Sequence, residues 1–195
     1  MKKWILLALK LLLAIFLIQL LLENLFLTPL GSRTETELNK YGRYNHYVDE
    51  SLNTRFHELL PSREDAQQCG EEYLYHYNCA LLGSPSFSIY LSAEMDEEAF
   101  EKEELRISAR TEHSFSVDDL QVCFVQGSMD SVRILFDDRM DDGYGMILEI
   151  AVLDHSRQEI TYFCADLTDG LIRHAHTDAF LQDLIALCDT AVREE

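Results

Sequence analysis

Basic residues are scarce in this chain, because 16 Lys and Arg stand against 35 Asp and Glu, a formal net charge of −19. Such an excess of negative charge repels the phosphates of nucleic acids and the anionic headgroups of lipids. Proline is also rare, with three residues, whereas the aromatic content of 10% is that of a folded chain. A disordered chain is therefore disfavoured, and we expect no nucleic-acid partner.

The cysteines lack the number and spacing of a disulfide framework or a metal motif. The five residues are Cys69, Cys79, Cys123, Cys164 and Cys188. An odd number cannot pair fully, and no C-x-x-C sequence occurs, so neither a zinc ribbon nor a thioredoxin-type pair is predicted. Cys123 and Cys164 fall in predicted strands and would meet if those strands were neighbours. Small buried thiols are the preferred interpretation.

The short motifs that mark common active sites are missing as well. None of the patterns G-x-S-x-G, H-E-x-x-H, G-x-x-x-x-G-K and G-x-G-x-x-G occurs. Ser and Cys nucleophiles then have no supporting context. We predict no catalytic residue, no cofactor-binding residue, no metal ligand and no cofactor, and we favour a protein that is not an enzyme.

One acidic segment, residues 137–142, partly fits a calcium-binding loop. Counted from Asp138, the residues Asp142, Gly143 and Glu149 fall where that pattern needs them. Met140, however, stands where an oxygen ligand is required, and no helices are predicted on either side. A solvated acidic hairpin loop is therefore the preferred interpretation.

Three histidines are candidates for a metal site or for acid–base chemistry. His174 and His176 lie two residues apart, but two ligands are too few for a metal site. His155 follows Asp154 as a base might follow its orienting acid, yet adjacent residues in a turn normally point apart. Plain loop residues are expected in both cases.

Several tyrosines are grouped in the first half of the chain and form either a sticky surface or part of the core. They are Tyr41, Tyr44, Tyr47, Tyr73, Tyr75 and Tyr77. Such residues more often fill a core and keep their hydroxyls in water, which is the interpretation we prefer.

The most prominent feature present is an apolar run at the N-terminus. Over residues 4–22 only Lys10 and Gln19 are polar. A bilayer core needs about 20 helical residues, and roughly fifteen apolar residues at about 0.3–0.6 kcal/mol each outweigh one Lys. We therefore predict a transmembrane signal anchor at 1–28, with 4–27 contacting the lipid bilayer.

Two alternatives to an uncleaved anchor remain open. A cleaved secretory signal fits Lys2 and Lys3, but the apolar core is long for one and no Ala-x-Ala step follows it. A helix buried in a soluble domain rarely shows apolar residues on every face. Basic residues on the two sides nearly tie, and we favour an inside N-terminus with an extracytoplasmic C-terminal domain.

The 167 residues after the anchor are enough for one domain with its own core. They hold 13 basic and 34 acidic residues, a formal charge of −21. This excess serves solubility, and it also favours cationic partners or counter-ions.

Periodicity predicts an α+β fold with an antiparallel sheet of about 5–6 strands and 2–3 packing helices. Helices are expected at 33–60, 96–109 and 177–192. Strands are expected at 73–79, 86–92, 120–124, 132–136, 144–153 and 160–164. Residues 29–60 are thus a helical linker or the first domain helix, and 61–195 form the acidic α+β domain. The capping-box sequence from Thr34 to Glu37 and the N-cap residue Asp96 mark two of the helix starts.

These features predict a single-pass membrane protein that presents a non-enzymatic extracytoplasmic binding or accessory domain, with another protein as the possible partner. A pilin-like assembly subunit shares the outline of an apolar helix followed by a sheet, but no Gly-Phe-type processing site precedes the run. A metal-dependent hydrolase using loop 137–142 is a further alternative.

Overall fold

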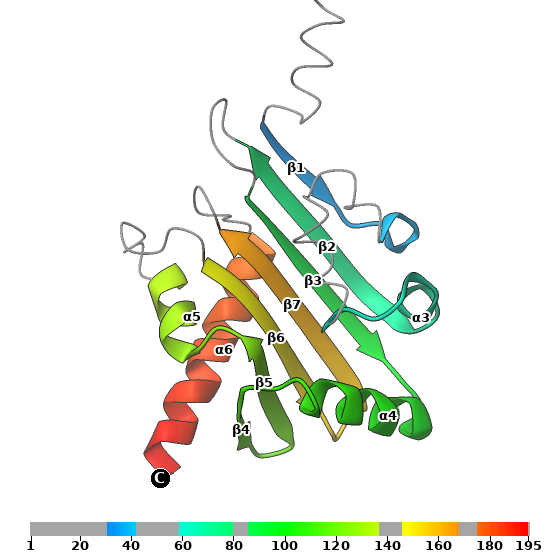
Figure 1. The fold of residues 1–195 in the computed structure, drawn as a ribbon. Helices are drawn as coiled ribbons and strands as arrows, with labels where there is room; N and C mark the ends of the chain where they lie inside the picture. The colour runs from blue at the N-terminus through cyan, green and yellow to red at the C-terminus, as the bar shows by residue number, and fades with distance from the viewer. Residues whose placement is uncertain (1–30, 42–58, 80–85, 137–145, 168–174, 195) are drawn as a thin grey trace, which may run out of the picture.

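The computed structural model describes residues 31–41, 59–79, 86–136, 146–167 and 175–194. Its centre is a seven-stranded sheet in the order β1-β2-β3-β7-β6-β5-β4, shown in Figure 1. Every neighbouring pair of strands is antiparallel. The strands are β1 (Gly31–Glu35), β2 (Gly70–Cys79), β3 (Ser86–Glu94), β4 (His113–Val117), β5 (Leu120–Gln126), β6 (Met146–Asp154) and β7 (Glu159–Leu167). The α+β fold and its antiparallel sheet are confirmed.

Helices cover both faces of this sheet. The described helices are η1 (Leu38–Lys40), α3 (Arg63–Cys69), α4 (Glu97–Ser108), α5 (Met129–Phe136) and α6 (Ala175–Glu194). Helix α4 crosses the front of the sheet in Figure 1 and α6 crosses behind it, with α5 packed beside α6. We call the two sides the α4 face and the α6 face.

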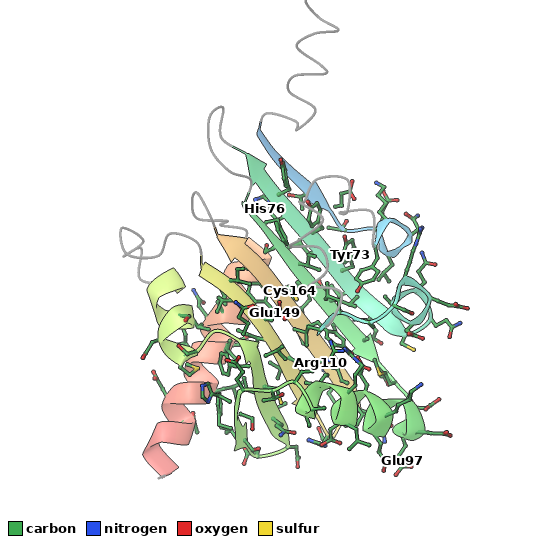
Figure 2. The ribbon with its side chains drawn as sticks, viewed as in Figure 1. Tyr73, His76, Glu97, Arg110, Glu149 and Cys164 are labelled. Carbon is green, nitrogen blue, oxygen red and sulfur yellow. The ribbon has the colours of Figure 1, made fainter. Side chains whose placement is uncertain are left out.

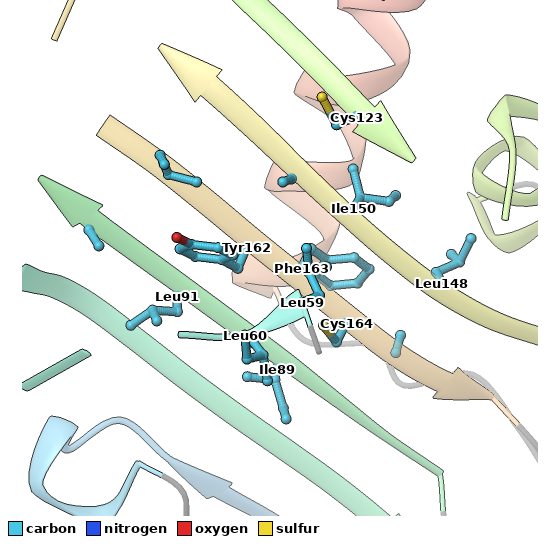
Figure 3. Close-up of a cluster of buried hydrophobic side chains, with 14 of the residues drawn as sticks. Leu59, Leu60, Ile89, Leu91, Cys123, Leu148, Ile150, Tyr162, Phe163 and Cys164 are labelled. Carbon is cyan, nitrogen blue, oxygen red and sulfur yellow. The ribbon is translucent and has the colours of Figure 1, made fainter. Parts of the chain in front are cut away.

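Strict alternation along β7 supplies core residues to both faces. Tyr162 and Cys164 point to the α4 face, while Phe163 points to the α6 face, and all three are fully buried. Figure 3 shows this central cluster, with Leu59 and Leu60 packed over the strands on the α4 side. Because β7 and β6 are buried on both sides, they form the interior of a three-layer domain.

The two long helices begin and pack as their sequences predict. In α4 the amide of Ala99 donates to Asp96 Oδ1 at 2.8 Å, which is the expected N-cap bond. Phe100 and Ile107 are the buried residues of this otherwise charged helix. Helix α6 buries Leu181 and Leu184 against the sheet.

The predicted helix at 33–60 is wrong at its start, where β1 pairs with β2 instead. The Thr34 hydroxyl lies 2.9 Å from His76 Nδ1 on the neighbouring strand, so it does not serve as a helix cap. Strand pairing at the edge of a sheet has overridden a local capping signal. Residues 42–58 lie outside the described part of the chain.

A second correction concerns residues 132–136, which were predicted as a strand and belong to helix α5. Apolar residues at Met129, Val132 and Leu135 also fit a helical stripe, so the periodicity was ambiguous. The amide of Val132 bonds to the carbonyl of Ser128 at 3.1 Å, and Asp130 lies in the first turn. These N-terminal signals favour the helix.

Two elements have no counterpart in the sequence-based prediction. Strand β4 forms a hairpin with β5 through Asp118 and Asp119, and Asp118 adopts a positive φ of 51°. The second is α3, whose N-cap Ser62 accepts a hydrogen bond from the amide of Asp65 through its hydroxyl. With β1 and β4 added, the sheet exceeds the predicted 5–6 strands.

The predicted membrane anchor at 4–27 lies outside the described residues. Within the described part, no helix combines the length and the apolar character needed to cross a bilayer.

Candidate functional site

A groove of about 310 Å³ lies on the α6 face, between α6 and the strands β3, β5, β6 and β7. Its apolar lining consists of Leu120, Val152, Phe180, Leu184 and Leu187. Its polar lining consists of Tyr90, Asp154, Arg157, Glu159, Thr161 and Asp183. Strands that lie far apart in the sequence therefore join with one helix to make a hollow that is both apolar and acidic.

The β6–β7 turn fixes one end of the groove. Asp154 Oδ1 accepts hydrogen bonds from the amides of Ser156 at 2.9 Å and Arg157 at 3.0 Å, and from Ser156 Oγ at 2.6 Å. Partial burial opposes ionisation of Asp154, but these bonds outweigh it and lower the pKa of the carboxyl. Gln158, with a φ of 53°, completes the turn, so that Arg157 and Glu159 emerge at defined positions.

Glu159 is a groove carboxylate that two neighbouring side chains hold in place. It is the first residue of β7 and lies opposite both Glu94 of β3 and Asp154 of β6. The Ser92 hydroxyl donates to its Oε1, and Arg157 Nη1 lies 2.7 Å from its Oε2. The Glu159 side chain is 14% exposed, whereas that of Arg157 is 62% exposed.

Tyr90 brings a phenol into the same hollow. Its ring stands edge-on to Phe180 of α6 with centroids 5.6 Å apart, and Phe180 in turn lies 5.2 Å from Phe163. Burial raises the pKa of Tyr90, and the charges of Glu72 and Glu159 add to the rise. The phenol therefore stays neutral at physiological pH.

Negative charge dominates the groove and its surroundings. Three carboxylates, those of Asp154, Glu159 and Asp183, face one guanidinium among the lining residues. Next to them, a hydrogen bond with Glu94 and the charge of that residue raise the pKa of Glu71. A raised carboxyl pKa indicates local crowding of negative charge, which a cationic ligand would relieve.

The groove combines apolar side chains with three carboxylates, one guanidinium and one phenol. Across the described residues, no group of three or more His, Cys, Asp and Glu side chains is placed to hold a metal ion.

Among the metal candidates from the sequence, the described residue Glu149 does not line this groove. Loop 137–142 lies outside the described residues. Glu149 is 3% exposed within β6 on the α4 face, directly opposite Cys164 on β7, as Figure 2 shows. Burial, with a smaller effect from Glu149, raises the pKa of the Cys164 thiol well above its usual range.

The side chains of His155 and Asp154 contact different residues, as expected for neighbours in a turn. The His155 ring stands edge-on to Phe100 with centroids 5.3 Å apart, and its Nε2 lies 3.9 Å from Glu104 Oε1. Asp154 is instead bonded to Ser156 and Arg157. His174 lies outside the described residues, whereas His176 lies in the first turn of α6, so the expectation of a loop residue is wrong for His176.

The cysteines follow the preferred interpretation as far as they are described. Cys69, Cys123 and Cys164 are free thiols, and Cys123 and Cys164 are buried. These two strands are not neighbours, because β6 separates β5 from β7. The condition for a contact between Cys123 and Cys164, that β5 and β7 be neighbours, is therefore not met.

The expectation that the described tyrosines fill the core is confirmed. The expectation that their hydroxyls stay in water is wrong for Tyr73, Tyr75 and Tyr77. Tyr73, Tyr75 and Tyr77 are at most 2% exposed, and their hydroxyl oxygens are buried too. Tyr41 is also buried and donates to the carbonyl of Pro61 at 2.9 Å. Tyr44 and Tyr47 lie outside the described residues.

The groove itself was not predicted. The clearest available signal was Tyr90, a large aromatic residue among small serines on the outward positions of a predicted strand. Its partners, Arg157 and Asp183, come from a turn and a helix much later in the chain. No local motif links the three.

No protein family model, no curated protein and no solved structure matches this chain. The functional argument therefore rests on the geometry and charge of the groove.

Proposed function

We propose that this chain is a single-pass membrane protein that presents a non-enzymatic binding domain. The predicted anchor at 4–27 holds it in the bilayer, with the acidic domain on the extracytoplasmic side. The groove beside α6 docks a segment of a partner protein that carries basic and apolar side chains. The observation that carries this proposal is the combination of five apolar side chains and three carboxylates that line one hollow.

Charge supports a basic partner rather than an acidic one. The chain after residue 28 has a formal charge of −21, which attracts cationic partners from a distance. Within the groove, a basic side chain would meet Asp183 and Glu159 while its apolar neighbours cover Phe180 and Leu187. Electrostatic attraction would then raise the association rate, and apolar burial would supply affinity.

The open form of the groove favours a peptide segment over a small molecule. Pockets for small molecules usually bury most of the ligand surface. Here the rim is solvated, since the side chain of Arg157 is 62% exposed and Asp183 is exposed. A chain segment can lay a few side chains into such a hollow while its backbone stays in water.

Binding is tested with the full-length protein in zwitterionic lipid nanodiscs. Three fluorescein-labelled peptides are compared, in which leucine alternates with arginine, glutamine or glutamate. We expect the arginine peptide to bind best and the glutamate peptide not to bind. Equal binding of all three, or preference for glutamate, would contradict the proposal.

A matched pair of variants locates the binding. D183N removes one negative charge from the groove, whereas E101Q removes the same charge from an exposed position on α4. We expect D183N to weaken arginine-peptide binding and E101Q to leave it near the wild-type value. Equal effects would mean that only the overall charge of the domain is sensed.

Anchoring is tested separately by fractionating cells that express the full-length chain. We expect the protein to stay with membranes after an alkaline carbonate wash, and a chain starting at residue 29 to be released. A full-length protein found in the soluble fraction would refute the anchor and leave the groove proposal to stand on its own.

A further inference from the structure

Arg157 occupies the rim of the groove in the manner expected of a basic ligand. Among the described lining residues it is the only one with a basic side chain. Its Nη1 lies 2.7 Å from Glu159 Oε2, a distance typical of a charge-assisted hydrogen bond. The chain thus shows, with a side chain of its own, that this carboxylate accepts a guanidinium.

The carboxylate is prepared for that contact independently of Arg157. Glu159 begins a central strand, and the Ser92 hydroxyl on β3 bonds to Oε1. This bond orients the group and leaves Oε2 for a second donor. With 14% of the side chain exposed, Glu159 is partly desolvated, which strengthens its attraction for a cation.

Arg157, by contrast, is held only loosely at its charged end. Its backbone is fixed by Asp154, but its side chain is 62% exposed and reaches Glu159 from the solvent side. The guanidinium is the exposed member of this pair, and an exposed charge regains its hydration when it separates from its partner. The guanidinium can therefore leave without disturbing the turn.

We propose that Arg157 is a built-in competitor that a basic side chain of the partner displaces from Glu159. This inference rests on the proposed function and concerns how the same groove is regulated. The exchange replaces one ion pair by another, so charge alone favours neither side. The partner gains its advantage by placing an apolar neighbour on the partly buried Phe180 and Leu187, which the well-exposed Arg157 does not match.

Two consequences follow from such an exchange. A peptide with arginine but no apolar residue should compete poorly, because it offers nothing that Arg157 lacks. Removing Arg157 should instead strengthen binding, which is the opposite of what a directly contacting residue would do. The sign of this single effect separates displacement from simple contact.

The test is the affinity of the arginine–leucine peptide for R157Q and for K102Q, each as full-length protein in zwitterionic nanodiscs. Both variants lose one positive charge, but Lys102 is exposed on α4, on the other face of the sheet. We expect R157Q to bind the peptide about three-fold more tightly than K102Q does. The effect is this small because an exposed arginine contributes little free energy to an ion pair. In an E159Q background the effect of R157Q should vanish, because the two changes act on one contact.

The outcomes separate the two proposals. If the wild type binds the peptide but R157Q binds with equal or lower affinity than K102Q, displacement is wrong and docking stands. If R157Q stays tighter in the E159Q background, the competitor does not act through Glu159 and the inference fails. If neither the wild type nor R157Q binds, the docking proposal and the inference both fail.

Discussion

Two arginine–glutamate pairs lie on opposite faces of the sheet and differ in how they are held. On the α4 face, Arg106 pairs with Glu103, and their side chains are 30% and 15% exposed. On the α6 face, Arg157 pairs with Glu159, and their side chains are 62% and 14% exposed. The glutamates are alike, so the difference lies with the arginines and with the groups around them.

The Arg106 pair is part of a closed network. Arg106 also donates to the carbonyl of Leu59, and Glu103 accepts a bond from the Tyr162 hydroxyl at 2.7 Å. The network therefore joins α4, the central strand β7 and the segment that precedes α3. Removing one member leaves the others desolvated and unsatisfied, which makes the network a structural element.

The Arg157 pair is open to water on the side of the arginine, and the Ser92 hydroxyl donates one further hydrogen bond to Glu159. The same two residue types thus support the fold in one place and leave an exchangeable contact in the other. What distinguishes them is the number of further partners and the exposure of the cation. This contrast gives the following predictions, from the largest effect to the smallest.

The largest loss of stability is expected for R106A. It leaves Glu103 partly buried beside Tyr162 without its counter-charge, which should lower the free energy of unfolding by about 2 kcal/mol. Urea unfolding followed by circular dichroism measures the change. K102A on the same helix is the control, and an equal loss in both would show that helix propensity or net charge is responsible.

A smaller loss of stability is expected for Y162F, which keeps the ring and removes the hydroxyl that donates a hydrogen bond to Glu103. The cost should be about 1 kcal/mol, the usual contribution of one such hydrogen bond. The double variant R106A/Y162F should lose less than the sum, because both changes break one network. Strict additivity of the two losses would mean that the network is not coupled.

The alkaline pH dependence of stability should distinguish the same two faces. Burial, with the charge of Glu103, raises the pKa of Tyr162 well above 10.0. The folded protein therefore holds this proton more tightly than the unfolded chain. This tighter proton binding by Tyr162 contributes to the free energy of unfolding. The contribution is fully present below about pH 10 and is lost as pH rises further, because the tyrosine ionises first in the unfolded chain.

Y162F should therefore flatten the fall in unfolding free energy between about pH 9 and about pH 11. Y90F should act in the same direction but less, since the pKa of Tyr90 is also raised, mainly by burial, but the residue is only half-buried. Urea unfolding across this pH range provides the measurement. A steeper fall in Y162F than in the wild type would reverse the assigned sign.

The smallest effect on stability is expected for R157Q. An exposed ion pair contributes about 0–1 kcal/mol, so the free energy of unfolding should change by less than about 0.5 kcal/mol. The same urea assay applies, with R106A as the reference. A loss in R157Q as large as that in R106A would remove the distinction between the two pairs.

The sequence was sufficient for elements whose period and ends agree. Strands β6 and β7 alternate clearly and flank a short polar turn, and Asp96 marks the start of α4. The sequence pattern was insufficient around Val132, where the spacing of apolar residues fits a helix and a strand equally well. It was also insufficient at Thr34, where strand pairing overrode a helix-capping sequence. Tertiary contacts decide such cases, and a single sequence does not show them.

The groove was beyond prediction for a different reason. Tyr90, Arg157 and Asp183 come from a strand, a turn and a helix, and only the sheet order brings them together. The crossover that places β3 beside β7 is a long-range pairing with no local signature. Acidic composition indicated a cationic partner, but it did not indicate where that partner would bind.

The most direct test of the account follows the Arg157 side chain itself. The Nε–H signal of Arg157 is assigned in a ¹⁵N-labelled full-length protein by its absence in R157Q, and the arginine–leucine peptide is then titrated. We predict that this signal moves to the position of a free, solvated arginine as α6 amide signals shift, while the Arg106 signal stays in place. If the α6 amides shift and the Arg157 signal does not, the peptide binds without displacing Arg157, and the central contrast between the two pairs is contradicted.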